Sequence, residues 1–240
     1  MDAHRSSDTV DHRAAGALLR QVAACRSVTA RLAQLARLLL GRPYVERPLG
    51  GGPDEPEELV TRLDGFDCVT LVESALALAR VRRAAAFAAE LRRLRYRDGR
   101  LAWSHRLHYF SDWLCHNQAR GVLRLRTRGA GSRAIGARLS AVAGLPPRRV
   151  RFHALPKRAL HRARRRVAAA NVVAFASTRA GLDFFHTGLL LVDPAQPEPE
   201  RWELIHASRS AGRVLAEPLQ DFLHRNRMRG LAWSSPCTMD

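Results

Sequence analysis

The sequence predicts an α+β fold in which a helical first half precedes an antiparallel sheet. Residues 14–121 contain long segments with apolar residues at helical spacing, whereas residues 170–219 consist of short runs rich in Val, Leu, Ile and Phe. Helices and strands are therefore segregated along the chain and do not alternate, which disfavours a parallel sheet.

Four segments of the first half are predicted to be helical. Residues 14–41 have apolar positions such as Leu18, Leu32 and Leu35, and a Gly- and Pro-rich loop follows them. Residues 68–95 are expected to be helical and could be continuous; their first half is apolar on nearly every side, which indicates a central buried helix. Residues 104–121 predict another helix or helix pair, and residues 136–147 the end of a further helix at Gly144.

Four strands are predicted in the second half, separated by short polar turns. Because they follow one another directly, we expect them to form an antiparallel meander. The four runs are "ANVVAFAST" (170–178), "DFFHTGLLLV" (183–192), "RWELIHAS" (201–208) and "GRVLAEPL" (212–219).

Length and hydropathy indicate a globular protein with a sizeable core. The 240 residues are 46% hydrophobic, and we expect one domain over residues 1–240 with flexible ends at about 1–15 and 235–240. No apolar run reaches the roughly 18 residues of a membrane span, and the N-terminus lacks the pattern of a secretory signal. We therefore expect a cytoplasmic protein, with periplasmic or exported as the alternative.

The net charge of +18 raises the question of an anionic partner. Of the 40 basic residues 39 are Arg, and the charge is spread except for one dense segment, residues 146–167. No nucleic-acid-binding motif is present, so nucleic acid is not the expected partner. A different anionic polymer or an acidic substrate explains the charge equally well.

Cys68 stands at the start of the apolar run "GFDCVTLVESALALAR". Asp67 can cap this helix and leave Cys68 in its first turn, where unpaired N–H groups favour a thiolate. A thiolate is the nucleophile of an acyl-transfer enzyme. The alternative is a small buried side chain. The other cysteines are expected to be ordinary buried or surface residues, and all four are expected to be thiols outside disulfides.

Two histidines on neighbouring strands are candidates for the base. A hairpin loop at about 193–199 would pair Val192 with Glu200, and therefore His186 with His206, both on one face. One could be the base and the other its orienter. His105, His108 and Cys115 do not have the spacing of a zinc site, and His116 cannot face the adjacent Cys115, so no metal is expected.

Three segments together resemble the bacterial N-acetylmuramoyl-L-alanine amidase-like family, of the NlpC-type branch of papain-like cysteine hydrolases. They are "GFDCVTLVESALALA", "RLHYFSDWLCHN" and the ordered motifs of "GLDFFHTGLLL…LIHAS…GRVL". The resemblance implies a papain-like fold with a helical N-terminal half packed on a C-terminal antiparallel sheet. It implies Cys68 as nucleophile, His186 as base and His206 as orienter. It also implies cleavage of the amide between N-acetylmuramic acid and L-alanine in peptidoglycan fragments, without metal or organic cofactor.

Further residues are assigned within the matching motifs. Glu73 is expected to form a buried ion pair or a capping contact. The motif "RLHYFSDW" is expected either to bind substrate or to form a packed helix face through four of its residues, Arg106, Tyr109, Asp112 and Trp113. The sequence departs from the family at Ala170–Asn171, where relatives usually have Gly-Asp before the first strand. Segment 146–167 is a candidate contact for an anionic wall polymer. The residues expected to contact substrate are Tyr44, Asp67, Arg106, Tyr109, Trp113 and Ser208.

Two other functions stay open at this point. One is an endopeptidase that cuts within the stem peptide of peptidoglycan. The other is a basic protein that binds nucleic acid or wall polymer without chemistry. Cys68, His186 and His206 argue against the second, because a pure binding protein has no need of this set of residues.

Overall fold

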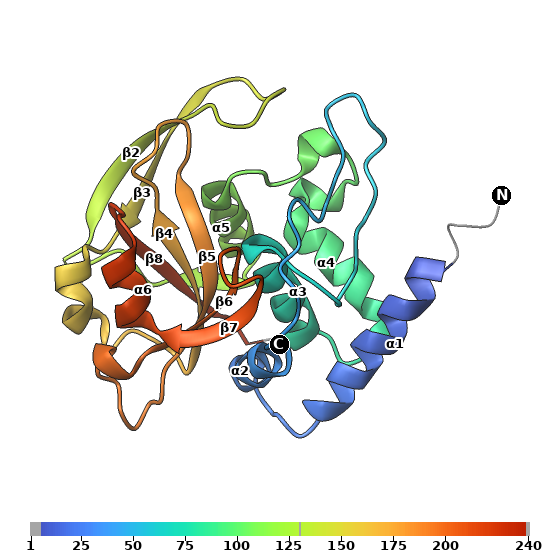
Figure 1. Ribbon diagram of the computed structural model, residues 1–240, viewed down its shortest axis with the longest axis horizontal. Helices are drawn as coiled ribbons and strands as arrows, with labels where there is room; N and C mark the ends of the chain where they lie inside the picture. Colours follow the sequence, from blue (N-terminus) through green and yellow to red (C-terminus); the bar gives the residue numbers. More distant parts are fainter. Residues whose placement is uncertain (1–5, 130, 239–240) are drawn as a thin grey trace. The chain divides into compact units, whose positions relative to one another are not determined.

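The computed structural model describes residues 6–129 and 131–238, and the chain divides into two compact units (Figure 1). Within the described residues, the first unit comprises residues 6–106 and 207–215, and the second comprises residues 107–206 and 216–238. Of the ends expected to be flexible, residues 6–15 lie in a helix and residues 235–236 in a strand. Residues 1–5 and 239–240 lie outside the described part.

The first unit is helical, as predicted, but its helices are shorter than the sequence suggested. The predicted helix over 14–41 is two helices, because the chain turns at residues 22–27 and the Ser27 side chain caps the second by accepting from Ala30 N at 3.1 Å. The helices are α1 (Ser6–Gln21), α2 (Val28–Leu38), α3 (Cys68–Arg80) and α4 (Phe87–Arg95), with the 3-10 turns η1 (Ala84–Ala86), η2 (Arg97–Gly99) and η3 (Trp103–His105).

Helix α3 is the buried centre of this unit, and it is not continuous with α4. Every residue from Thr70 to Ala79 is buried, which confirms the expected central helix. The helix ends at Arg80 because Val81 adopts an extended conformation with φ −110° and ψ 158°. The buried Arg31 of α2 donates to the carbonyl oxygens of Leu78 and Val81, which satisfies groups that a helix end leaves without partners.

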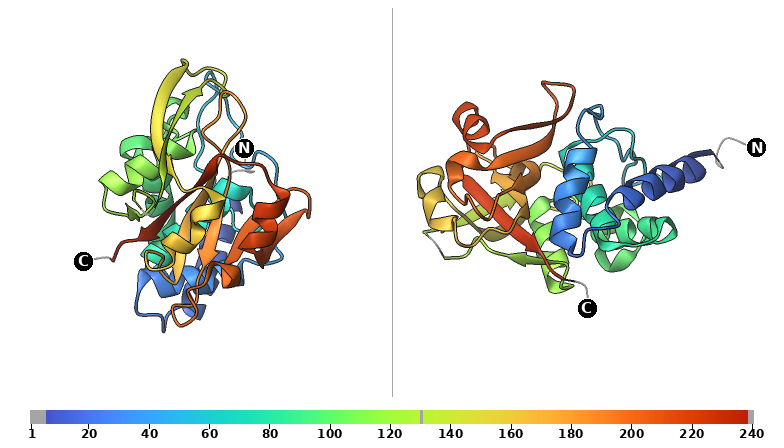
Figure 2. Two further views of the ribbon diagram at one scale, coloured as in Figure 1. Left: turned by 90° about the vertical axis from the view of Figure 1, so that its left-hand side faces the viewer. Right: turned by 90° about the horizontal axis from the view of Figure 1, so that it is seen from below.

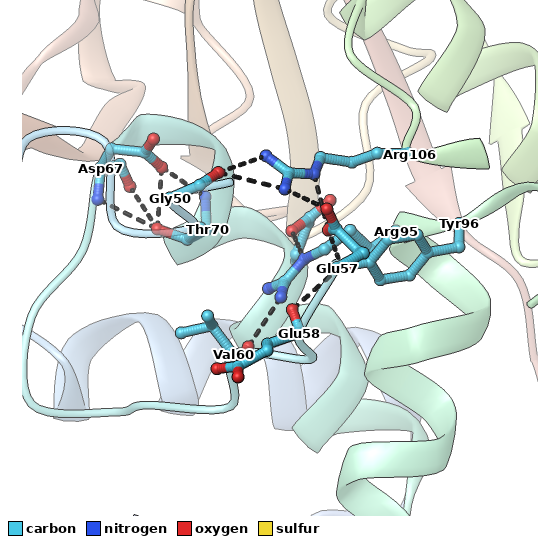
Figure 3. A network of polar contacts seen from close by, with 10 residues as sticks. Gly50, Glu57, Glu58, Val60, Asp67, Thr70, Arg95, Tyr96 and Arg106 are labelled. Atoms are coloured by element: carbon cyan, nitrogen blue, oxygen red, sulfur yellow. Dashed lines mark hydrogen bonds and ion pairs between the residues drawn. The ribbon is translucent and has the colours of Figure 1, made fainter. Parts of the chain in front are cut away.

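An ion pair fixes α4 against α3 in the interior. Arg95 Nε lies 2.7 Å from Glu73 Oε2, and both side chains are only 2% exposed. Arg95 also donates to the Val60 carbonyl at 2.6 Å (Figure 3). The buried ion pair expected at Glu73 is thereby confirmed. Losing either partner would leave a buried charge without compensation, so the pair couples both helices to the loop before α3.

The second unit is built on an antiparallel sheet with strand order β1-β8-β4-β5-β6-β7. The meander predicted over four runs is confirmed as β4 to β7, and the two strands added beyond β4 were not predicted. The chain enters the first unit after His206 and returns at Ala216. The strands are β1 (Leu123–Leu125), β4 (Ala170–Ala176), β5 (Phe184–Leu191), β6 (Glu203–Ser208), β7 (Arg213–Pro218) and β8 (Gly230–Pro236).

A separate two-stranded ribbon replaces a predicted helix. Strands β2 (Arg133–Leu139) and β3 (Arg148–Ala154) pair with each other in a two-stranded sheet of their own (Figure 2). The prediction of a helix that ends at Gly144 is therefore wrong. Ile135 and Leu139 are buried while Gly136 and Arg138 are exposed, an alternation with the period of a strand that the apolar count alone did not reveal.

Helices cover the sheet of the second unit. The described helices are α5 (Phe110–Ala119), α6 (Leu219–Arg225) and the 3-10 helices η4 (Lys157–Ala163) and η5 (Pro199–Arg201). Strand β4 is buried along its whole length, and Phe175, Trp233 and Phe222 belong to one apolar core. None of the helices in the described ranges is long and apolar enough to cross a membrane.

Asn171, where the sequence is expected to depart from the family, stabilises the turn before β4. The fully buried Asn171 amide donates to the Ala168 carbonyl at 2.7 Å and accepts from Ala168 N at 3.0 Å. Its oxygen also accepts from Ser235 Oγ at 3.0 Å, which ties the turn to β8. A carboxylate could accept these bonds but could not donate one, so asparagine satisfies both groups of Ala168.

Candidate active site

Cys68 is the first residue of α3, at the N-terminus of the buried helix. Asp67 caps the helix: its Oδ1 accepts from Thr70 N at 2.7 Å, and Asp67 N donates to Thr70 Oγ1 at 3.0 Å (Figure 3). The predicted cap and the predicted position of Cys68 are therefore confirmed. Unpaired N–H groups and the helix dipole favour negative charge at this point, which suits a thiolate and an oxyanion.

The other three cysteines lack this setting, and none of the four forms a disulfide. Cys115 lies within α5, where burial and then the nearby Asp112 raise the pKa of its thiol. Cys25 lies in the turn before α2 and Cys237 beyond the end of β8. Within the described residues, Cys68 is thus the cysteine whose surroundings favour a nucleophile.

Tyr44 lies beside Cys68, as the resemblance implied. Val45 N donates to the Phe66 carbonyl at 2.9 Å and Phe66 N to the Pro43 carbonyl at 3.0 Å, which aligns the two segments. Gly65 permits this approach, because a Cβ there would lie 2.6 Å from Val45 Cγ2. Burial, followed by the charges of Cys68 and Asp67, raises the pKa of Tyr44. Its hydroxyl therefore stays protonated and can donate.

Arg106 belongs to the same unit, and its guanidinium is held by the chain itself. It contacts both carboxylate oxygens of Glu57, at 2.9 and 2.5 Å, and donates to the Gly50 carbonyl at 3.1 Å (Figure 3). Tyr96 donates to Glu57 at 2.5 Å, so one carboxylate serves two donors. This network fixes residues 50–57, and a contact of Arg106 with substrate stays a prediction.

Ser208 is the last residue of β6, directly before the turn to β7. Its hydroxyl accepts from Ala211 N at 3.3 Å and lies 3.2 Å from Ser210 Oγ, so it stabilises the turn. Tyr44 N donates to the Gly212 carbonyl at 2.8 Å and joins this turn to the tyrosine segment. A contact of Ser208 with substrate stays a prediction.

In the second unit, Tyr109 and Trp113 pack into the interior at α5. Trp113 is 0% exposed and stacks on Phe110 with ring centroids 4.9 Å apart. The Tyr109 hydroxyl accepts from Val142 N at 3.1 Å, and Arg148 lies over its ring while pairing with Asp112. The structure thus shows the packed helix face that was one of the two expectations for the "RLHYFSDW" motif. Substrate binding by Tyr109 and Trp113 stays a prediction.

His186 of β5 and His206 of β6 form a hydrogen-bonded pair on one face of the sheet. His186 Nε2 lies 2.7 Å from His206 Nδ1, and the rings meet edge to face, 89° apart. The expected juxtaposition of the two histidines is therefore confirmed.

The strand register that led to this expectation was wrong by two residues. Leu189 pairs with Ile205 and Leu191 with Glu203, so His206 falls opposite Gly188 and the histidines are diagonal neighbours. A shift of two residues keeps each side chain on its face, which is why the prediction of a shared face survived. Diagonal neighbours lie within reach of aromatic rings.

Burial keeps both histidines neutral. It lowers the pKa of His186 to about 3, with a further contribution from His206. Burial also lowers the pKa of His206, while a hydrogen bond with Glu217 opposes the shift. Phe222 of α6 contacts both rings, with centroids 5.4 Å away in each case. A neutral imidazole held at one nitrogen is suited to accept a proton at the other.

Three residues around the pair were not predicted from the sequence. Glu217 Oε1 lies 2.8 Å from His206 Nε2, and Arg225 binds the same carboxylate. Gly188 faces His206: a Cβ there would lie 3.1 Å from His206 Cβ and 2.8 Å from the Ile205 carbonyl. The one signal available was that Glu217 is the only acidic residue of "GRVLAEPL".

The structure assigns no metal-binding cluster. Among residues 6–129 and 131–238, no group of three or more His, Cys, Asp or Glu side chains is arranged to hold a metal ion.

Residues 34–231 match the sequence profile of the AmiA-like family, described as N-acetylmuramoyl-L-alanine amidase-like. The chain belongs to this family. The resemblance drawn from the three sequence segments is therefore confirmed. None of the curated proteins compared with the chain matches it.

Solved structures support the same relationship. A Legionella pneumophila protein of the DUF1460 family is 19% identical over 96% of both chains, with a TM-score of 0.82, and shows the shared fold. An N-acetylmuramoyl-L-alanine amidase from Bacteroides uniformis is 25% identical over 88% of this chain and 99% of its own, with a TM-score of 0.71. The chain thus has an amidase-like fold of helices and an antiparallel sheet.

Replacing Gly188 by alanine should separate the two histidines. The new Cβ would meet the Ile205 carbonyl and His206 Cβ, and overpacking of this kind costs about 1–3 kcal/mol. Gly136→Ala in β2 is the matched control, because nothing lies within 4 Å of its Cβ position, and its stability should stay within about 0.5 kcal/mol of the parent. Urea unfolding of both variants measures the difference. Equal stabilities would contradict the close packing at Gly188.

Proposed function

We propose that the protein is a cysteine amidase that hydrolyses the amide between N-acetylmuramic acid and L-alanine in peptidoglycan fragments. In this proposal the fold is papain-like, of the NlpC type, and Cys68, His186 and His206 act together. The observation that carries it is the histidine pair, with 2.7 Å between His186 Nε2 and His206 Nδ1, in a chain that also places Cys68 at a capped helix start. The family and the Bacteroides uniformis amidase support the bond class.

The first half-reaction forms a thioester. The Cys68 sulfur attacks the lactyl carbonyl carbon, and His186 accepts the thiol proton. N–H groups at the start of α3, including that of Cys68, stabilise the oxyanion. The C–N bond then breaks as His186 protonates the amine of L-alanine, which leaves.

The second half-reaction returns the enzyme to its starting state. His186 accepts a proton from a water molecule, and the resulting hydroxide attacks the thioester carbon. The C–S bond breaks, His186 returns its proton to the sulfur, and the muramic acid leaves as a carboxylic acid that ionises to its carboxylate by releasing a proton to water. The chain's own groups and water supply every proton and electron pair in both half-reactions.

An endopeptidase acting within the stem peptide would use the same chemistry on a different amide. The family name and the Bacteroides uniformis amidase favour the bond to muramic acid. We propose that the protein acts on soluble fragments released from the wall, in the cytoplasm. A basic binding protein without chemistry would leave the histidine pair and the capped cysteine without a role.

The proposed reaction is tested with N-acetylmuramyl-L-alanine and a longer muramyl tripeptide, with products identified by mass spectrometry. The parent protein should release L-alanine from the first and the intact tripeptide from the second. Cys68→Ala should release neither, because no thioester can form, while the control Cys115→Ala should match the parent. His186→Ala should lose about 10²- to 10⁴-fold in rate, the usual contribution of a general base.

Two results would overturn this function. Cleavage between amino acids of the tripeptide, with the bond to muramic acid intact, would identify an endopeptidase. Turnover by Cys68→Ala at the parent rate would exclude the cysteine mechanism.

We further propose that segment 146–167 contacts an anionic wall polymer. It carries nine basic residues and no acidic one. In the ribbon, Arg149 lies directly opposite Arg138, an unfavourable pairing of like charges that a polyanion would relieve. Lys157 is less available to a polyanion than the exposed arginines of this segment, because its ammonium donates to the Leu223 and Asn226 carbonyls.

Replacing the exposed Arg149, Arg164 and Arg165 by glutamine should weaken binding of a polyanionic glycan and reduce its salt dependence, because fewer charges take part. Turnover of N-acetylmuramyl-L-alanine should change by less than about twofold. Binding by sedimentation or fluorescence anisotropy at several salt concentrations measures the effect. A large loss of turnover on the small substrate would place this segment in the active site instead.

A further inference from the structure

Glu217 lies at the far end of a chain of hydrogen bonds that begins at His186. His186 Nε2 lies 2.7 Å from His206 Nδ1, and His206 Nε2 lies 2.8 Å from Glu217 Oε1. Arg225 binds Glu217 Oε2, so the carboxylate is held at both oxygens. The side chain of Glu217 is only 13% exposed, which limits competition from water.

We infer that Glu217 is a positioning residue that fixes the tautomers of both histidines, so that the unprotonated Nδ1 of His186 is the nitrogen available to the nucleophile. The positions of the protons follow from the bonds themselves. What that nitrogen does in the reaction rests on the proposed function.

The assignment begins at the carboxylate. A carboxylate can only accept hydrogen bonds, so His206 must donate to it from Nε2. A neutral imidazole carries one N–H, and burial keeps His206 neutral by lowering its pKa. Nδ1 of His206 is therefore an acceptor, and His186 must donate to it from Nε2. The same reasoning leaves Nδ1 of His186 with a lone pair.

The reverse arrangement would disable the proposed base. If His206 carried its proton on Nδ1, it would donate to Nε2 of His186, and His186 would carry its own proton on Nδ1. That nitrogen could then no longer accept a proton from a thiol. The choice between the two arrangements depends on whether the group at Glu217 accepts or donates.

Helix α6 holds this end of the chain in place. It begins directly after Pro218, and Arg225 is its last residue. Phe222 of the same helix packs against both imidazole rings. Within the second unit, the charged and titratable groups that act on His206 are His186, Glu217 and Arg225. One short helix thus supplies both the packing and the countercharge that keep Glu217 oriented.

The tautomers are measured directly by two-bond ¹H–¹⁵N correlation spectra of the histidine rings in the full chain, assigned with His186→Gln and His206→Gln. In the parent at pH 7, both rings should be neutral with the proton on Nε2. In Glu217→Gln the side chain has nearly the same shape but can donate, so the ring signals should shift toward the Nδ1–H form. Glu198→Gln is the control, because Glu198 is exposed.

Kinetics with N-acetylmuramyl-L-alanine supply a second readout. Glu217→Gln should lower kcat by about 10- to 100-fold, the usual effect of losing a partner that orients a functional histidine, with KM within about twofold. Arg225→Met should have a smaller effect, because Oε1 still accepts from His206. A purely structural role would instead lower the melting temperature and leave the ring tautomers unchanged.

The inference is overturned if His206 in the parent carries its proton on Nδ1, or if Glu217→Gln leaves both the ring spectra and kcat unchanged. Failure of the proposed function is a separate result. A parent protein that cleaves no muropeptide would refute the amidase reaction, while the ring spectra would still decide the tautomers. If Glu217→Gln does not fold, the spectrum of the parent alone is decisive.

Discussion

The antiparallel pairing of β5 with β6 is the constraint on which the histidine site depends. It places His186 and His206 on one face as diagonal neighbours, close enough for the 2.7 Å contact between their rings. It also requires glycine at position 188, where any side chain would collide with β6. Burial against Phe222 then keeps both rings neutral, because a charged imidazole would lose its hydration without full compensation.

A second backbone pairing of this kind determines the surroundings of Cys68. The pairing of residues 43–45 with Phe66, made possible by Gly65, brings Tyr44 beside the start of α3. The Asp67 cap then ends the loop and begins the helix at Cys68. Both arrangements therefore depend on close approach at a glycine, Gly188 beside His206 and Gly65 beside residues 43–45.

The sequence predicted those features that depend on local pattern. The capped helix at Cys68 and the four strands of the meander follow from neighbouring residues, whereas the partner of Glu73, Arg95 of α4, could not be named from the sequence. The register error arose because the 3-10 helix Pro199–Arg201 lengthens the connection, so that β6 begins at Glu203. Glu217 and Arg225 could not be predicted, because their contacts with His206 depend on how β7 and α6 fold back onto β6.

The central claim is that His186 accepts the proton of Cys68, and the reactivity of this thiol tests it most directly. In a protein with Cys25, Cys115 and Cys237 replaced by serine, the rate of alkylation by iodoacetamide is measured at pH 6 and at pH 10. The rate at pH 6 divided by the rate at pH 10 should be at least about 10-fold larger with His186 than in His186→Ala, because the neutral ring can accept the thiol proton at pH 6 and the thiol of the variant has no such acceptor. Equal ratios in the two proteins would contradict the account.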